Sequence, residues 1–124
     1  MTLLPVQTII EAAINIRGDI MEELIVKLKA LCDESRLSII GLLANRELCA
    51  CDFVENLDLT QPTISHHLKV LVESGLVICD RRGKWCFYKN NDKEIKSFME
   101  DLERLAGTRK ENIKLCNTDC NGRR

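Results

Sequence analysis

Two cysteines separated by one residue are the side chains of this sequence best suited to bind a soft ligand. Cys49 and Cys51 lie at the start of a predicted short helix, residues 50–56, where Asp52 completes a capping box with Cys49. A helix N-terminus is expected to lower the pKa of a thiol and to favour the thiolate. Thiolates select soft metals and metalloids. We expect Cys49 and Cys51 to bind such an ion; the alternative is two small cysteines that only cap the helix.

The spacing of this pair predicts a structural cost of binding. Residues i and i+2 of a helix point about 200° apart, so both thiols reach one ion only if the first helical turn unwinds. Unwinding would disturb the support of the next helix in the chain.

That next helix has the polar pattern of a DNA reader. Thr60 is its expected N-cap, Pro62 lies in its first turn, and Gly75 supplies the left-handed residue after its end. The N-terminal side chains of such a recognition helix face base edges in the major groove, and Gln can bond adenine through two hydrogen bonds. The alternative is a polar surface helix without a ligand. The candidate base-contacting residues are Gln61, Thr63, Ser65, His66 and His67.

Positive charge is concentrated in the same part of the chain. Residues 61–90 hold five basic and two acidic side chains, whereas the whole chain has a net charge of −1. Basic side chains near DNA bind phosphates, which position a protein without specifying a sequence. The candidate phosphate-binding residues are Lys69, Arg81, Arg82 and Lys84.

Residues 76–88 have β character and predict a hairpin, which after a helix-turn-helix is a wing. We expect its turn at Arg82 and Gly83, so that Cys79 lies opposite Cys86 and Val77 opposite Tyr88. The two wing cysteines are then either inert small residues or a reversible disulfide.

Apolar residues at helical spacing predict further helices at residues 6–16, 20–31, 33–43 and 92–105, with Asp33 as the N-cap of the third. Cys32, just before that cap, is expected to be a buried structural residue. The expected fold class is mainly α with a small β-hairpin, a winged helix-turn-helix. Residues 1–107 would form this domain and residues 108–124 a flexible, cysteine-containing tail.

Length and composition indicate the number of domains, the class of protein and its cellular compartment. Its 124 residues suit one domain, and 45% hydrophobic and 30% charged residues are ordinary for a globular protein. We find no apolar run of the roughly 18 residues that span a membrane and no signal-peptide pattern, so we expect a cytoplasmic protein without a membrane partner. Seven cysteines in a reducing compartment indicate metal or redox chemistry.

Four segments together carry a family resemblance: residues 28–37, 49–52, 61–71 and 83–88. In this order and spacing the chain resembles the ArsR/SmtB family of metal-responsive repressors. The resemblance implies a homodimer, joined through its first and last helices, that binds double-stranded operator DNA and releases it when metal binds.

The resemblance also narrows the ligand to trivalent arsenic or antimony as inducer, without an organic cofactor. Arsenite sensors of this type often carry a third cysteine where this chain has Val54, so Cys116 and Cys120 of the tail become the leading candidates for further metal ligands. The family's zinc site on the last helix is expected to be absent, because residues 92–105 contain no His.

Three alternatives remain beside arsenic sensing. A cadmium or lead sensor would use the same cysteine pair. A thiol-redox or persulfide sensor of this family would need cysteines inside the helices at 33–43 and 92–105, which have none. An enzyme, such as a thiol oxidoreductase, is disfavoured because the chain lacks a βαβ context and a catalytic constellation.

Overall fold

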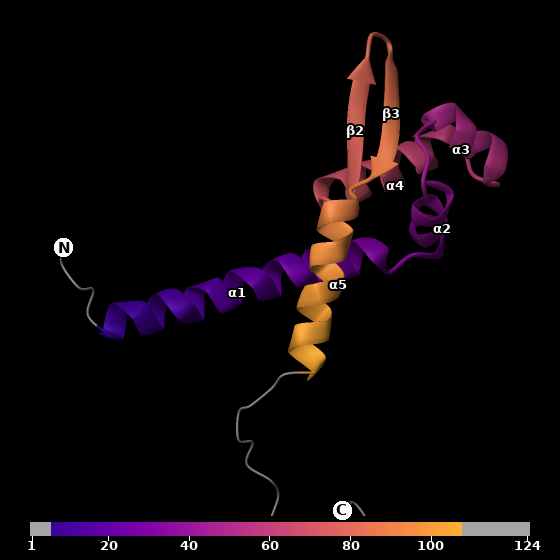
Figure 1. The fold of residues 1–124 in the computed structure, drawn as a ribbon. Helices are drawn as coiled ribbons and strands as arrows, with labels where there is room; N and C mark the ends of the chain where they lie inside the picture. Colours follow the sequence, from indigo (N-terminus) through magenta and orange to yellow (C-terminus); the bar gives the residue numbers. More distant parts are fainter. Residues whose placement is uncertain (1–5, 108–124) are drawn as a thin grey trace, which may run out of the picture.

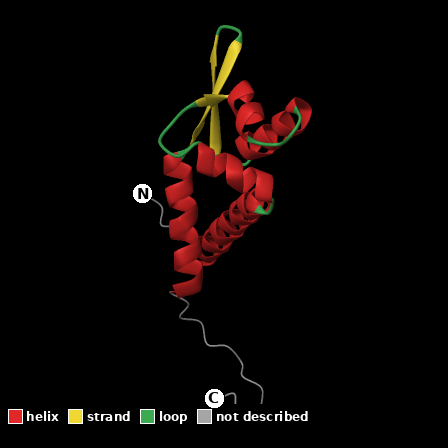
Figure 2. Ribbon diagram, turned by 90° about the vertical axis from the view of Figure 1, so that its right-hand side faces the viewer, coloured by secondary structure: helices red, strands yellow, loops and turns green. Residues whose placement is uncertain are grey.

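The structure is a computed structural model that describes residues 6–107, with side chains from residue 19 onward. The predicted tail at residues 108–124, with Cys116 and Cys120, lies outside the described residues. Five helices and a small sheet form a helical body from which a β-hairpin projects (Figures 1 and 2). In chain order the elements are α1 (Val6–Leu31), α2 (Glu34–Leu42), β1 (Leu48–Cys49), α3 (Ala50–Asn56), α4 (Gln61–Glu73), β2 (Val77–Arg82), β3 (Trp85–Asn90) and α5 (Asp92–Gly107). The predicted mainly helical winged helix-turn-helix is confirmed.

Helix α1 unites the two stretches expected at residues 6–16 and 20–31 and packs against α5 (Figure 1). Leu24 of α1 and Phe98 of α5 are buried. Lys27 is also buried, and its Nζ lies 2.9 Å from Glu94 Oε2 of α5. The ion pair compensates the burial of the Lys27 charge and ties the two helices together.

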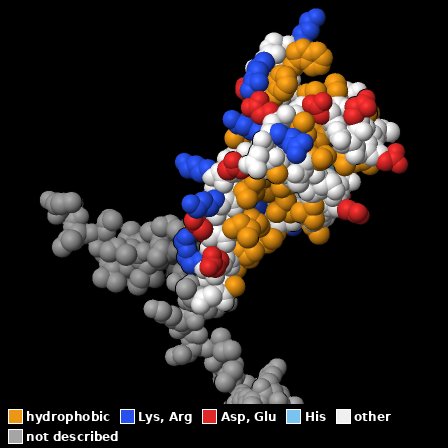
Figure 3. Space-filling view, turned by 45° about the vertical axis from the view of Figure 1, so that its right-hand side comes forward, with side chains coloured by type: hydrophobic (Ala, Val, Ile, Leu, Met, Phe, Trp, Pro, Cys, Tyr) orange, Lys and Arg blue, Asp and Glu red, His pale blue; other side chains and the backbone are white. Residues whose placement is uncertain are grey.

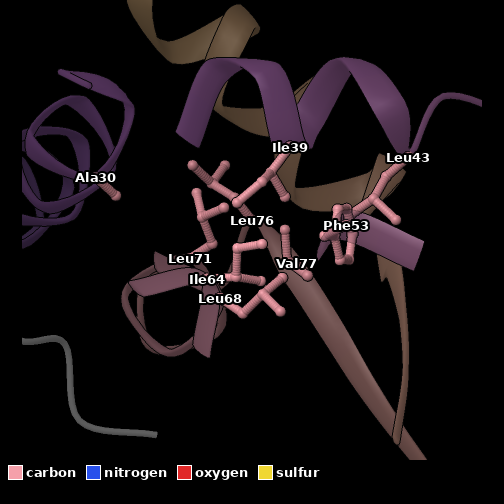
Figure 4. Close-up of a cluster of buried hydrophobic side chains, with 9 residues drawn as sticks. All are labelled: Ala30, Ile39, Leu43, Phe53, Ile64, Leu68, Leu71, Leu76 and Val77. Atoms are coloured by element: carbon pink, nitrogen blue, oxygen red, sulfur yellow. The ribbon is translucent and has the colours of Figure 1, made fainter. Parts of the chain in front are cut away.

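Helices α3 and α4 form the helix-turn-helix. The main hydrophobic core packs them against the rest of the domain. Helix α4 contributes Ile64, Leu68 and Leu71, which are fully buried and lie on one face of the helix. They pack with Ile39 of α2 and Phe53 of α3 (Figure 4). Because this face of α4 is buried, its opposite face is the one presented to solvent.

The helix caps explain why these elements begin and end where they do. Asp33 Oδ1 accepts a hydrogen bond from the Arg36 N–H at 3.0 Å, as its role as N-cap of α2 predicts. Gly75 follows α4 with φ +88°, the left-handed conformation expected there. Thr60 is the N-cap of α4 by its backbone, but its hydroxyl bonds the Thr63 hydroxyl at 2.8 Å rather than the helix amides.

The sheet has a third strand that the sequence did not indicate. Its order is β1-β3-β2, and β1 pairs antiparallel with β3 through Leu48 with Tyr88 and Cys49 with Phe87. A strand of two residues is too short to show an alternating pattern. It joins the cysteine segment directly to the wing.

The predicted register of the wing is wrong. The turn lies at Gly83 and Lys84, with Arg82 opposite Trp85, so Cys79 pairs with Tyr88 rather than with Cys86. Gly83 has φ +63°, which suits the first central position of a two-residue hairpin turn. The predicted turn would have put Arg82 at that position, where a side chain is strained.

Among the described residues, no helix combines the length and apolarity needed to cross a bilayer.

The core predicts a large difference between two leucine truncations. Leu71→Ala should lower the free energy of unfolding by about 2–5 kcal/mol, because Leu71 is 0% exposed and its removal leaves a cavity. Leu37→Ala is the matched control: Leu37 is 53% exposed, and a change within about 0.5 kcal/mol is expected. Urea unfolding of both variants checks this, and equal losses would contradict the assigned core.

Candidate nucleic-acid interface and thiolate site

The exposed face of α4 holds most of the residues predicted to read DNA. Its solvent-exposed members are Gln61, Thr63, Ser65, His66 and Lys69. On one face of the molecule, Lys and Arg side chains gather along one edge (Figure 3). The polar face of α4 therefore remains available to a ligand while the apolar face is held by the core.

His67 is placed differently from its neighbours on α4. It is half-buried, and its Nδ1 lies 3.1 Å from Arg36 Nη1 of α2. Since a guanidinium can only donate, His67 Nδ1 is the acceptor, and the ring proton of a neutral His67 is on Nε2. Arg36 Nε also donates to the Ala30 carbonyl at 2.6 Å. His67 thus links α4 to α2 and the end of α1, a long-range role with no signal in the sequence.

The basic residues of the wing fall into two groups. Arg81 and Lys84 are exposed, with no ion-pair partner among the described residues. Arg82 Nη2 instead lies 2.8 Å from Glu47 Oε2 and 3.1 Å from Asp80 Oδ2. The carboxylates of Asp80 and Glu47 raise the pKa of Arg82 further above its ordinary value.

Arg82 also connects the wing to the cysteine segment. Its guanidinium lies 4.9 Å from the centre of the Phe87 ring, and Phe87 is the strand partner of Cys49. Its ion-pair partner Glu47 comes two residues before Cys49. The tip of the hairpin is therefore tied to the same segment by backbone pairing and by charge.

Cys49 both ends β1 and caps α3. Its N–H donates to Asp52 Oδ2 at 2.9 Å, and its thiol donates to the same oxygen at 3.2 Å. The Asp52 N–H completes the capping box toward the Cys49 side chain. The predicted capping box is confirmed.

Only Cys51 of the two cysteines lies in the helical backbone of α3. Cys49 has extended backbone angles, φ −92° and ψ 169°, so the helical spacing rule does not apply to it. The thiol and the N–H of Cys51 are near enough to Cys49 to act on the pKa of its thiol. Cys51 is exposed and Cys49 half-buried. The pair can therefore approach one ion without unwinding α3.

The predicted lowering of the Cys49 pKa is also wrong. The Asp52 N–H does lower the pKa of this thiol, but partial burial, the Asp52 carboxylate and the Cys51 thiol together raise the pKa above its ordinary value. The three raising influences, of which burial is the largest, together outweigh the N–H at the helix N-terminus. Cys49 is therefore held as a thiol that donates a hydrogen bond to Asp52.

The other candidate ligands do not join this pair within the described residues. No group of three His, Cys, Asp or Glu side chains suited to hold a metal ion occurs in this part of the chain. Cys116 and Cys120 lie outside it. Cys32 is exposed, not buried as predicted, because it lies in the short connection between α1 and α2.

Comparison with known proteins agrees with this architecture. The family model "Bacterial regulatory protein, arsR family" matches residues 33–78. The arsenical resistance operon repressor of Staphylococcus aureus is 42% identical over 81 residues, which cover 65% of this chain and 78% of that protein. The protein of the same name from Bacillus subtilis (strain 168) is 33% identical over 86 residues, covering 68% and 82%.

A solved structure shows the same fold. The ArsR-like transcriptional regulator from Rhodococcus sp. RHA1 superposes with a TM-score of 0.64 and 28% identity, covering 68% of this chain and 80% of that one. Fold and relatives together define a winged-helix transcriptional regulator and not an enzyme. The chain belongs to the arsR family of bacterial regulatory proteins.

The cap of α3 predicts a component of acid sensitivity. The Cys49 N–H, followed by its thiol, lowers the pKa of Asp52 below its ordinary value of 3.8. This stabilisation is fully present above the unfolded-state pKa and is lost as the pH falls through the lower folded-state pKa. Between pH 7 and about pH 3, Asp52→Asn should therefore lose less unfolding free energy than the wild type.

Urea unfolding at several pH values measures this difference. Glu55→Gln is the control, because Glu55 is an exposed carboxylate of the same helix outside the cap. It should keep the acid dependence of the wild type. Identical pH profiles for Asp52→Asn and the wild type would contradict the role given to Asp52.

Proposed function

We propose that this chain is a homodimeric repressor that binds operator DNA in the cytoplasm and is released when trivalent arsenic or antimony binds Cys49 and Cys51. The observation that carries the proposal is the position of the two thiols. They adjoin each other at the start of α3, and β1 pairs their segment with the wing. The named relatives are arsenical resistance operon repressors.

The DNA-binding part of the proposal rests on α4 and the wing. Gln61, Thr63, Ser65 and His66 are exposed and would meet base edges, while Lys69, Arg81 and Lys84 would bind phosphates. His67 and Arg82 would also contribute to DNA binding. In the structure, His67 contacts Arg36 and Arg82 contacts Glu47.

The dimer would form through α1 and α5. Apolar side chains that the single chain leaves exposed support this arrangement. On the described part of these helices they are Ile20, Met21, Ile25, Val26 and Leu28 of α1 and Met99 and Leu105 of α5. A twofold dimer would read operator half-sites about 10 bp apart, or a multiple of that spacing.

The thiolate site suits a soft ion. Cys49 and Cys51 supply two sulfur donors, and we propose Cys116 or Cys120 of the tail as the source of a further one. Cadmium or lead would use the same thiolates, and this remains the alternative inducer class.

Release of the protein from DNA would follow from the loss of the Cys49 thiol proton. When Cys49 gives up its thiol proton to bind the ion, its S–H hydrogen bond to Asp52 disappears and the α3 cap loses one of its contacts. Helix α3 supports α4 through Phe53 in the shared core, and Cys49 pairs with Phe87 of the wing. A change at the cysteine pair therefore reaches both DNA-binding elements.

Arsenite should release the reduced protein from DNA taken from upstream of its own gene. Cys49→Ser combined with Cys51→Ser should keep DNA binding but abolish release, because the two sulfur donors are lost. Cys32→Ser is the matched control, since Cys32 is an exposed thiol outside the site, and it should respond like the wild type. Fluorescence anisotropy of labelled DNA during arsenite and cadmium titrations measures this.

Two outcomes of that titration would overturn the arsenic assignment. Release by cadmium but not arsenite would identify a heavy-metal sensor. Unchanged arsenite release in the doubly substituted protein would move the inducer site away from Cys49 and Cys51.

The salt dependence of binding separates the roles of the DNA-binding residues. Lys69→Ala and Arg81→Ala should each reduce the slope of log Kd against log salt by about 1, because one phosphate contact is lost. Gln61→Ala should cost about 1–3 kcal/mol on the operator and much less on unrelated DNA. Lys96→Ala, an exposed lysine of α5, is the control and should leave the slope unchanged. Unchanged slopes in all variants would exclude the exposed face of α4 and the wing as the phosphate-binding surface.

A further inference from the structure

The wing contains a second pair of thiols that the arsenic site does not use. Cys79 of β2 and Cys86 of β3 are joined by a disulfide, and their Cα atoms are 6.1 Å apart. This separation is within the usual range for disulfides. Both residues are half-buried. The backbone of the wing therefore brings the two sulfurs together without rearrangement.

The sheet separates this pair from the arsenic site. Cys79 is directly opposite Tyr88, and Cys86 is opposite Arg81, so the two cysteines are diagonal neighbours on one face of the hairpin. Cys49 pairs with Phe87, which points to the other face because side chains alternate along a strand. Cys49 thus lies on the opposite face of the sheet from Cys79 and Cys86.

The disulfide encloses the basic tip of the wing. The chain between the two cysteines, residues 80–85, holds Arg81, Arg82 and Lys84. Strand β1 reaches only Phe87 and Tyr88 of β3, so beyond them the backbone pairs only within the hairpin, and the exposed Arg82–Glu47 ion pair ties the tip to the body. The tip projects from the helical body (Figure 2). A two-stranded hairpin is only marginally stable in water, so a cross-link has a large effect there.

We propose that Cys79 and Cys86 form a redox-responsive site whose disulfide orders the wing and strengthens DNA binding. The proposal rests on DNA binding by the wing, as proposed above, but not on the inducer. Disulfides in a reducing compartment are characteristically transient and redox-sensing. Arg81 lies opposite Cys86 and on the same face as Cys79, so a basic residue neighbours the pair on the sheet.

The oxidant class is a peroxide. A thiolate of the pair attacks one oxygen of hydrogen peroxide, the O–O bond breaks, and the resulting sulfenic acid condenses with the second thiol. Two thiols and one peroxide give one disulfide and two waters. Glutathione returns the pair to thiols by exchange, through a mixed disulfide and with formation of glutathione disulfide.

The disulfide should strengthen DNA binding because it orders the tip of the wing. A cross-linked tip holds its basic side chains near their bound positions before DNA arrives, so less conformational entropy is lost on binding. The oxidised protein should therefore bind promoter DNA about three- to tenfold more tightly than the reduced protein.

The test combines a redox titration with DNA binding on the full chain. Wild-type protein is equilibrated in glutathione buffers of different ratio, quenched in acid, alkylated and mapped by peptide mass spectrometry. The same samples are then measured by anisotropy with labelled promoter DNA. The double variant Cys79→Ser with Cys86→Ser removes the bond, and Cys32→Ser is the matched control.

We expect a reversible disulfide between Cys79 and Cys86 and tighter DNA binding when it is formed. Only the variant that lacks both wing cysteines should lose this difference in DNA affinity. Failure of the pair to oxidise, or equal DNA affinity of both redox states, would overturn it, and both are measured on the wild type. Arsenite release from the reduced samples depends on Cys49 and Cys51, so it tests the proposed inducer separately.

Discussion

The domain depends on one small capping interaction. A single oxygen of Asp52 accepts both the N–H and the thiol of Cys49, at the residue where β1 ends and α3 begins. The strand joins this residue to the wing, and the helix joins it through Phe53 to the core beneath α4. Because one side chain serves as cap, strand end and candidate ligand, its chemistry cannot change without altering its neighbours.

Local interactions account for what could be predicted from the sequence. Asp33, Asp52 and Gly75 act on groups within a few residues of themselves, so their types and spacing are sufficient to place the ends of helices. The hairpin was predictable for the same reason. Its register was not, because a turn shifted by one residue leaves the alternating pattern of the strands unchanged, and the positive φ of Gly83 decides between the two.

Contacts between distant residues account for what could not be predicted. Arg82 and Glu47 are 35 residues apart, and Arg36 and His67 are 31 apart, so no local pattern reveals either pair. The helical spacing rule does not apply to Cys49 and Cys51, because Cys49 is the cap rather than a helical residue. Partial burial, the Asp52 carboxylate and the Cys51 thiol together reverse the expected direction of the Cys49 pKa. In each case the geometry of the fold corrects the chemistry expected of the site.

Amide hydrogen exchange of the reduced, DNA-free protein, with and without arsenite, tests the link between the thiolate site and the wing most directly. We expect arsenite to change exchange at Cys49, whose N–H is held by Asp52, and also across the strand pair at Phe87 and Tyr88. A change confined to residues 49–52, with the wing amides unaffected while arsenite is bound, would contradict it.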